Sequence, residues 1–290
     1  IEVAAVVTAP DRKSGRGQKI SQSAVKRFAI ENNLPVLQPV NLKDEAFQTE
    51  LSSYGAQLFV IVAFRMLPES VWNMPELGSI NLHGSLLPNY RGAAPINWAV
   101  INGETKTGCT TFFIRQEIDT GDIIDQVEID IKEDATAGDV HDELMVKGAT
   151  LLTSTIKDVF NGSYSRRDQL DGVKMEELKD APKIFREDCL IDWKENTSTI
   201  YNKVRGLSPY PAAWCGMESG GKEKTMKIFS AWKNIDGVNH SGELLVQDGV
   251  LKLGCSDGWL EPNHVQLEGK KRMSVKEVMN GFDFSKWKLV

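Results

Sequence analysis

The chain has 290 residues, of which 41% are hydrophobic and 26% charged. This is enough for one large or two ordinary domains, and it excludes a chain that is disordered throughout. No apolar run approaches the roughly 20 residues of a membrane-spanning helix, because the most apolar segment, residues 58–64, has only the length of a strand. The net charge of −6 excludes nucleic-acid binding through positive charge spread over the whole surface.

The charge is unevenly distributed along the chain. Residues 1–182 contain 18 Lys and Arg against 26 Asp and Glu, a balance of −8, whereas residues 183–290 contain 16 against 14, a balance of +2. A mildly basic part joined to an acidic part could bring a nucleic acid to a distant active site. Ordinary variation in surface charge explains the same numbers equally well.

Cysteine and histidine usage argues against metal sites and disulfides. The four cysteines are far apart and include no CxxC pair: Cys109, Cys189, Cys215 and Cys255. We therefore expect unpaired thiols in a reducing, cytoplasmic compartment. No metal is expected, since His141, His240 and His264 have no cysteine or carboxylate cluster at metal-ligand spacing.

Strand and helix patterns alternate through the first half of the chain. Strands are predicted for residues 3–9, 58–64, 79–83, 109–114 and 123–129, and helices for residues 21–32, 47–54, 95–102 and 135–160. The continuous apolar run at residues 58–64 is typical of a strand buried on both faces of a parallel sheet. The alternation predicts an open α/β sheet with crossover helices.

The second half has a different pattern. Residues 161–182 are polar and charged and are interpreted as a linker, which separates a domain at residues 1–160 from one at residues 183–290. Short apolar segments between turn residues follow, and they predict a small β-barrel or β-meander. Residues 274–290 return to a helical pattern.

The most informative segment is Ser-Ile-Asn-Leu-His-Gly-Ser-Leu-Leu-Pro at residues 79–88. Residues two apart in a strand share a face, so Asn81 and His83 point the same way where the strand gives way to a loop. Ligands of open α/β sheets bind at the carboxyl ends of the strands. An amide beside an imidazole can stabilise an oxyanion and move a proton; taken alone, the two residues could also be a structural pair.

A second segment, Glu-Ile-Asp-Thr-Gly-Asp at residues 117–122, carries three acids around a Thr-Gly turn. The acids could be simple turn chemistry. One of them could instead place a carboxylate beside the imidazole and favour its charged form. The spacing alone leaves both interpretations open.

These motifs resemble the formyltransferase family that uses 10-formyltetrahydrofolate. The resemblance rests on HGSLLP (83–88), NYRGAAPINWAVINGE (89–104) and IDTGDI (118–123). The methionyl-tRNA branch of the family is matched further by PDRKSGRGQK (10–19), LPVLQPVNL (34–42), KIFREDCLIDW (183–193), VRGLSPYPAAW (204–214) and EGKKRM (268–273). The resemblance therefore covers nearly the whole chain.

The resemblance implies a doubly wound, Rossmann-like open-sheet domain followed by a small, OB-like β-barrel that binds tRNA. The family's first strand and helix have no counterpart here, and we expect a segment before Ile1, where the chain opens without a methionine. The implied reaction moves the formyl group of 10-formyltetrahydrofolate to the amino group of initiator methionyl-tRNA. It requires no metal, membrane or obligate protein partner.

The resemblance also assigns roles to particular residues. The catalytic set falls on Asn81, His83 and Asp119. Folate binding falls on Phe64, Arg65, Leu67, Ser85, Leu86, Leu87, Pro88, Glu117 and Ile118. Contacts to tRNA fall on Arg12, Lys13, Arg16 and Lys19.

Two alternatives remain. The first is a sugar-nucleotide or nucleotide formyltransferase on the same scaffold, which the basic segment and the C-terminal domain disfavour. The second is a non-catalytic nucleic-acid-binding protein, which the joint presence of Asn81, His83 and Asp119 disfavours.

Overall fold

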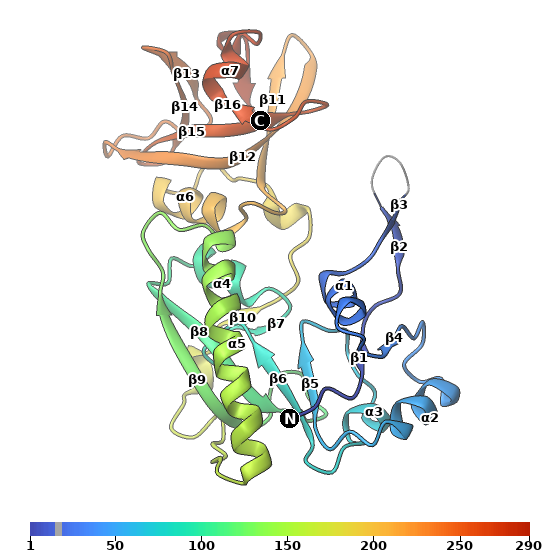
Figure 1. Cartoon of the computed structure of the whole chain (residues 1–290). Helices are drawn as coiled ribbons and strands as arrows, with labels where there is room; N and C mark the ends of the chain where they lie inside the picture. Colours follow the sequence, from blue (N-terminus) through green and yellow to red (C-terminus); the bar gives the residue numbers. More distant parts are fainter. Residues whose placement is uncertain (15–18) are drawn as a thin grey trace. The chain divides into compact units, whose positions relative to one another are not determined.

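Strands and helices alternate along the first half of the chain, as predicted (Figure 1). The computed structural model describes residues 1–14 and 19–290. The strands are β1 (Val6–Val7), β2 (Arg12–Ser14), β3 (Lys19–Ser21), β4 (Val36–Leu37), β5 (Phe59–Val62), β6 (Ser79–His83), β7 (Arg91–Gly92), β8 (Lys106–Phe113) and β9 (Ile123–Asp130). The helices are α1 (Ala24–Glu31), α2 (Glu45–Ser53), α3 (Glu69–Trp72), α4 (Pro95–Ile101) and α5 (Ala137–Asn161).

Parallel pairing confirms the predicted open α/β class. β1 pairs with β4 and β5 pairs with β6, both in parallel, with helices in the connections. The largest sheet of this half has four strands in the order β5-β6-β8-β9 (Figure 1). Parallel neighbours need crossover connections, which explains why α1 lies between β1 and β4 and α3 lies between β5 and β6 in the sequence.

Local sequence signals explain the helix limits. The Ser23 side chain accepts a hydrogen bond from the Lys26 backbone N–H at the start of α1, as a helix N-cap does. Pro95 occupies the first turn of α4, where its missing N–H costs nothing. Apolar side chains of α2 at helical spacing, Phe47 and Leu51, are buried against Leu37 of β4 and Val71 of α3.

Two expectations for the first half need correction. The strand predicted at residues 3–9 is limited to Val6–Val7, because only these residues and Val36–Leu37 are in pairing register. β5 is covered on one face only by the described residues, since Val60 and Val62 are 42% and 51% exposed. An apolar run indicates strand formation, but it does not determine which faces other elements cover.

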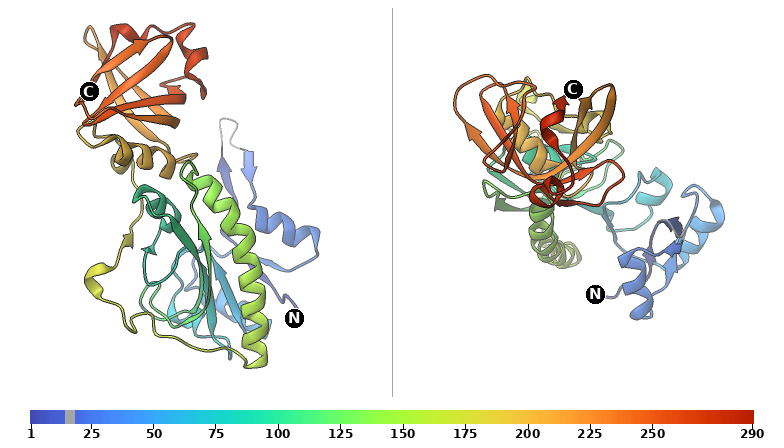
Figure 2. Two further views of the ribbon diagram at one scale, coloured as in Figure 1. Left: turned by 90° about the vertical axis from the view of Figure 1, so that its left-hand side faces the viewer. Right: turned by 90° about the horizontal axis from the view of Figure 1, so that it is seen from above.

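The second half contains one curved antiparallel sheet, formed by β11 to β17. The elements of this half are η1 (Met175–Glu177), β10 (Asp180–Ala181), η2 (Glu187–Cys189), α6 (Thr197–Gly206), β11 (Ala213–Ser219), β12 (Lys222–Ile235), β13 (Leu244–Gln247), β14 (Val250–Cys255), β15 (Gly258–Leu267), β16 (Met273–Ser274), α7 (Val275–Met279), η3 (Phe284–Lys286) and β17 (Lys288–Leu289). The strand order is β13-β14-β15-β12-β11-β17, with β16 beside β15. β13 at one end contacts η3 near the other end, so the sheet forms a nearly closed barrel (Figure 2).

The predicted small barrel is therefore confirmed, but its last segment is not the helix that the sequence pattern suggested. The helix ends at Met279, and β17 then pairs with β11 through Met217 and Leu289. Phe284, 1% exposed, belongs to the barrel core. The free edge of β11 and the burial of Phe284 outweigh the weak local helix preference of this segment.

Chain contacts divide the protein into two units that are not simple halves of the sequence. The first comprises residues 1–83, 111–125 and 151–171, and the second comprises residues 84–110, 126–150 and 172–290. β8, β9 and α5 contribute residues to both. Within the described residues, no helix has both the length and the apolar composition to cross a membrane.

We predict that all four cysteines resist thiol reagents in the folded protein. They are buried, and burial raises the pKa of Cys109 and Cys255 to about 11 and that of Cys215 to about 12. Burial also raises the pKa of the Cys189 thiol. The thiolate is the reactive form. Titration with a chromogenic disulfide near neutral pH should detect no fast thiol before denaturation and four afterwards. One thiol that reacts rapidly in the folded chain would contradict this prediction.

Candidate active site

The carboxyl end of β6 carries the two polar residues singled out in the sequence. Asn81 and His83 alternate with Ile80 and Leu82, so they share one face of the strand. On the opposite face, Ile80 is fully buried in a cluster with Phe113 and Val159. β6 lies between β5 and β8 in the sheet. Apolar packing on one face therefore fixes the direction of the two polar side chains on the other.

Asp119, which lies between β8 and β9, is brought to His83. Its Oδ2 is 3.7 Å from Nδ1 of His83, and the two side chains are only 8% and 10% exposed. This distance is longer than a hydrogen bond but short for two groups that can carry opposite charges. With little water around them, the electrostatic interaction between these two groups is screened less than it would be at the surface. Of the two interpretations left open by the sequence, the geometry favours the carboxylate beside the imidazole.

Asn81 carries an unusual polar atom. Its Oδ1 is buried and has no hydrogen-bond partner among the described residues. A buried acceptor without a donor is destabilising and is rare in folded proteins. A bound molecule that donates an N–H or O–H group to this oxygen would remove the cost. The amide is therefore suited to hold a polar ligand next to His83.

The loop that carries Asp119 is held in an uncommon backbone conformation. Asp119 has a φ of 54°, in the left-handed region that non-glycine residues seldom adopt. At Gly121 an added Cβ would lie 1.6 Å from the carbonyl oxygen of Phe113, so only glycine can pass there. The Phe113 backbone N–H donates to the carbonyl oxygen of Asp122 at 3.1 Å. Arg115 adds two hydrogen bonds to the Asp122 carboxylate, at 2.8 and 2.7 Å.

Gln169 completes the loop and was not expected from the sequence. It is 3% exposed and donates hydrogen bonds from Nε2 to the carbonyl oxygens of Asp119 and Gly121. It lies within residues 161–182, which were interpreted as a linker. No local pattern distinguishes it from the polar residues around it, because its partners are about 50 positions away in the chain.

The residues expected to bind folate after β5 and after β8 have three different environments. Phe64 and Leu67 pack against the apolar cluster around α2. Arg65 is exposed, and its guanidinium donates to the carbonyl oxygens of Pro39 and Val40 at 2.5 and 2.9 Å. Glu117 and Ile118, which precede Asp119 in the loop, are both exposed. The last two are thus free to meet a ligand without first losing internal packing.

The loop after β6 is fixed by hydrogen bonds within the second unit. Ser85 is fully buried and donates from Oγ to the carbonyl oxygen of Asn89 at 2.6 Å. The Leu87 backbone N–H donates to Oγ1 of Thr110, and Gln126 donates to the Leu87 carbonyl oxygen. Leu86 and Pro88 are half-buried beside these residues. The backbone of this loop is therefore well ordered before any ligand binds.

The described parts of the basic segment expected to contact tRNA are two short antiparallel strands, β2 and β3. β2 and β3 pair so that Lys13 opposes Ile20, and Arg12, which is exposed, opposes Ser21. Lys19 lies on β3. Arg16 lies outside the described residues. Next to β2, the Lys26 ammonium pairs with Asp11 at 2.7 Å, which ties the segment to α1.

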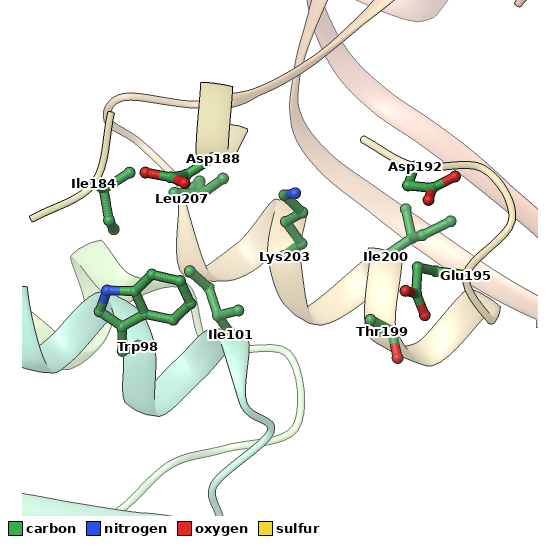
Figure 3. Close-up of a pocket in the computed structure, with 10 residues that line it drawn as sticks. All are labelled: Trp98, Ile101, Ile184, Asp188, Asp192, Glu195, Thr199, Ile200, Lys203 and Leu207. Atoms are coloured by element: carbon green, nitrogen blue, oxygen red, sulfur yellow. The ribbon is translucent and has the colours of Figure 1, made fainter. Parts of the chain in front are cut away.

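A separate pocket in the second unit contains none of the predicted site residues. Figure 3 shows its lining: Trp98 and Ile101 of α4, Ile200 and Lys203 of α6, and the carboxylates of Asp188, Asp192 and Glu195. It encloses about 200 Å³. Burial lowers the pKa of Lys203 in its wall, and the ammonium of Lys203 donates to the Leu190 carbonyl oxygen at 2.5 Å. Neither in this pocket nor in the rest of the described part of the chain do three His, Cys, Asp or Glu side chains form a group that could hold a metal ion.

The fold and the site together define the class of protein: an enzyme with an open α/β domain that carries polar groups at the carboxyl end of a central strand, followed by a small β-barrel. Comparisons with known proteins agree with this. The family model described as "Formyl transferase" matches residues 1–156, and "Formyl transferase, C-terminal domain" matches residues 183–283. The chain belongs to the formyl transferase family.

Curated proteins similar to this chain include methionyl-tRNA formyltransferases. The protein of Flavobacterium johnsoniae is 49% identical, with 98% of this chain and 90% of that protein covered. The protein of Bacteroides thetaiotaomicron is also 49% identical, with 98% and 89% covered. The likeness therefore extends over both matched domains.

Solved structures show the same fold at lower identity. WlaRD, a sugar 3N-formyl transferase solved with dTDP and 5-N-formyl-THF, is 20% identical with a TM-score of 0.61, and 92% of this chain and 88% of that chain are covered. HypX of Aquifex aeolicus, solved with tetrahydrofolic acid, is 22% identical with a TM-score of 0.60. Here 86% of this chain is covered, but the chain spans only 43% of HypX.

We predict that Gly121→Ala destabilises the protein by roughly 1–3 kcal/mol, the usual range for forced overpacking. The added methyl group would meet backbone rather than a flexible side chain. Gly281→Ala is the matched control, because an added Cβ there meets nothing within 4 Å. Thermal and urea unfolding midpoints of both variants test the prediction. Equal midpoints would show that the loop can move aside without cost.

Proposed function

We propose that the chain transfers the formyl group of 10-formyltetrahydrofolate to the amino group of initiator methionyl-tRNA, giving formylmethionyl-tRNA for the start of translation in the cytoplasm. The observation that carries the proposal is the His83–Asp119 pair, whose side chains are 3.7 Å apart and nearly enclosed, with His83 on the same strand as Asn81. Near 50% identity to methionyl-tRNA formyltransferases over nearly the full chain supports the choice of substrate.

Asn81 and His83 would act on the oxygen of the formyl group. When bound, the folate supplies the formyl carbon that the amine attacks and the N10 atom that leaves. Negative charge then develops on the formyl oxygen. The amide N–H of Asn81 and an N–H of the His83 ring can both donate to that oxygen, since the two side chains share one face of β6. The Oδ1 atom of Asn81, which has no partner among the described residues, would then accept a hydrogen bond from an N–H or O–H group of the bound substrates.

Asp119 would support the positive charge on His83 and help to pass a proton from the attacking amine to the departing nitrogen. The carboxylate is close enough to the ring for strong attraction and is only 10% exposed. Neither covalent attachment to the enzyme nor a metal is needed for this sequence of steps. The folate is a co-substrate, because each turnover removes its formyl group.

The remaining roles are proposed from the resemblance and the local environment of each residue. Folate would contact Glu117 and Ile118, whose side chains are exposed. It would also contact the segment that follows β5, which carries Phe64, Arg65 and Leu67. It would also contact the ordered backbone of Ser85, Leu86, Leu87 and Pro88. The tRNA would contact Arg12, Lys13, Arg16 and Lys19 of the basic segment and the mildly basic barrel.

A sugar-nucleotide formyltransferase is the main competing function. Its support is limited to the fold, since the solved sugar formyltransferase WlaRD is 20% identical. A radiolabelled formyl-transfer assay that compares charged methionyl-tRNA with a dTDP-linked amino sugar separates the two functions. Transfer to the amino sugar alone would overturn the proposal, and transfer to neither would favour a non-catalytic nucleic-acid-binding protein.

We predict that Asp119→Asn lowers kcat by about 10²–10³, the usual cost of losing charge stabilisation of an oxyanion. The substitution keeps the shape of the side chain but removes its negative charge. Binding of folate and tRNA should change far less, because the interaction is stronger in the transition state than in the ground state. Measurement of kcat and both binding constants, with His83→Ala in parallel, tests this. A nearly active Asp119→Asn enzyme would reduce residues 117–122 to a structural turn.

We also predict that Arg16→Ala weakens the use of methionyl-tRNA and leaves folate binding nearly intact. Loss of one phosphate contact should reduce the slope of log KM against log salt concentration by roughly 0.7–0.9. Arg27→Ala is the control, because Arg27 is an exposed arginine of α1 outside the basic segment. The KM for tRNA should rise only for Arg16→Ala. Equal effects of both variants on tRNA, or equal loss of folate and tRNA binding, would assign the segment a general or structural role.

A further inference from the structure

Gln169 lies in the first unit, on the segment that follows α5. Backbone hydrogen bonds in both directions between Ile123 and Arg167, at 2.8 and 3.0 Å, attach this segment to the start of β9. Gln169 follows two residues later and is 3% exposed. The pairing therefore delivers a buried amide side chain directly to the loop that carries Asp119.

The amide of Gln169 joins two carbonyl groups of that loop. Its Nε2 donates to the Asp119 carbonyl oxygen at 2.9 Å and to the Gly121 carbonyl oxygen at 2.6 Å. An amide nitrogen has two N–H groups, so each carbonyl can receive its own hydrogen. A side chain with no donor would leave both carbonyl oxygens without these bonds, and such loss is costly in a buried place.

Residues 119–121, whose carbonyl groups at both ends accept hydrogen bonds from Gln169, are the part of the loop whose conformation needs support. Asp119 has a φ of 54°, and such a conformation persists only where surrounding contacts determine it. A bond from Thr120 Oγ1 to the Glu117 carbonyl oxygen holds the residues before it, and the Phe113–Asp122 backbone bond closes the loop after it. Gln169 acts between these two, on the peptide groups immediately after Asp119 and Gly121. A change in these peptides would rotate the Asp119 carboxylate relative to His83.

We infer that Gln169 is a positioning residue, which holds Asp119 beside His83 and so sets the rate of the chemical step without touching either substrate. The inference rests on the proposed function only for its kinetic consequences. The positioning itself concerns the surroundings of His83 and can be observed without turnover.

The test compares Gln169→Met with wild type, alone and combined with Asp119→Asn. Methionine preserves length and volume but has no N–H donor. We expect kcat to fall by up to about 10²-fold, as for a misplaced catalytic group, with KM for folate and tRNA nearly unchanged. In the Asp119→Asn background the same substitution should cost little more, because two residues that act through one interaction are not additive. Equal losses in both backgrounds, or an unchanged kcat, would overturn the inference.

A second measurement does not depend on activity. The ring C–H signals of His83 in NMR spectra should change in Gln169→Met in the same direction as in Asp119→Asn. Gln57→Met is the matched control, since Gln57 is an exposed glutamine of the same unit. His83 signals that match wild type in Gln169→Met would overturn the inference, whatever the outcome of the transfer assay. If Gln169→Met does not fold, Gln169→Asn, which keeps the amide but shortens its reach, serves the same comparisons and should give a smaller change of the same kind.

Discussion

Gly121 passes so close to the carbonyl oxygen of Phe113 that a Cβ there would lie 1.6 Å from it. This approach lets the chain turn back directly after β8, with the Phe113 N–H bonded to the Asp122 carbonyl oxygen. The short return leaves Asp119 at the turn, in a left-handed conformation and 3.7 Å from His83. The charge arrangement around His83 therefore depends on a backbone approach that only glycine permits.

Packing in the rest of the first unit fixes β6, the strand that carries His83. Ile80 is packed on one face of β6 with Phe113 and Val159, so Asn81 and His83 are fixed on the other. Because Phe113 ends β8 and also packs against Ile80, one residue connects the strand that carries His83 with the loop that carries Asp119. The side chains of His83 and Asp119 are only 8% and 10% exposed, and low solvent exposure strengthens electrostatic interactions. The unsatisfied oxygen of Asn81 is a cost that a binding site can carry and a purely structural strand would not need.

The fold itself does not select the acceptor of the formyl group. WlaRD is a sugar 3N-formyl transferase and has a TM-score of 0.61 to this chain at only 20% identity. A shared scaffold can serve several substrates when the parts outside the catalytic centre differ. In this chain those parts include the paired strands β2 and β3, and residues 183–290, where the charge balance is +2 rather than −8. Selection of tRNA would thus depend on the charged surface of these parts, and formyl transfer on the enclosed pair of His83 and Asp119.

Short-range patterns in the sequence were sufficient for the fold class and for the shared orientation of Asn81 and His83, whereas the catalytic role of the two residues came from the family resemblance. Apolar periodicity and turn residues are local properties, and they predicted the alternating strands and helices and the small barrel. Strand alternation placed Asn81 and His83 on one face, because that geometry needs only the two-residue repeat. Asp119 was assigned through family resemblance, since spacing alone could not distinguish it from its neighbours.

Only the tertiary structure revealed the features that depend on residues distant in the sequence. The end of the chain, at Lys288–Leu289, forms a strand rather than the predicted helix because it pairs with the edge of β11. Gln169 looked like an ordinary polar linker residue until folding brought it to carbonyl groups about 50 positions earlier. Hydrogen-bond partners and close approaches are set by the packing of the whole unit, and no local periodicity records them. The sequence by itself therefore determined the alternation of strands and helices and the shared face of Asn81 and His83, whereas the position of the Asp119 carboxylate was decided by tertiary contacts.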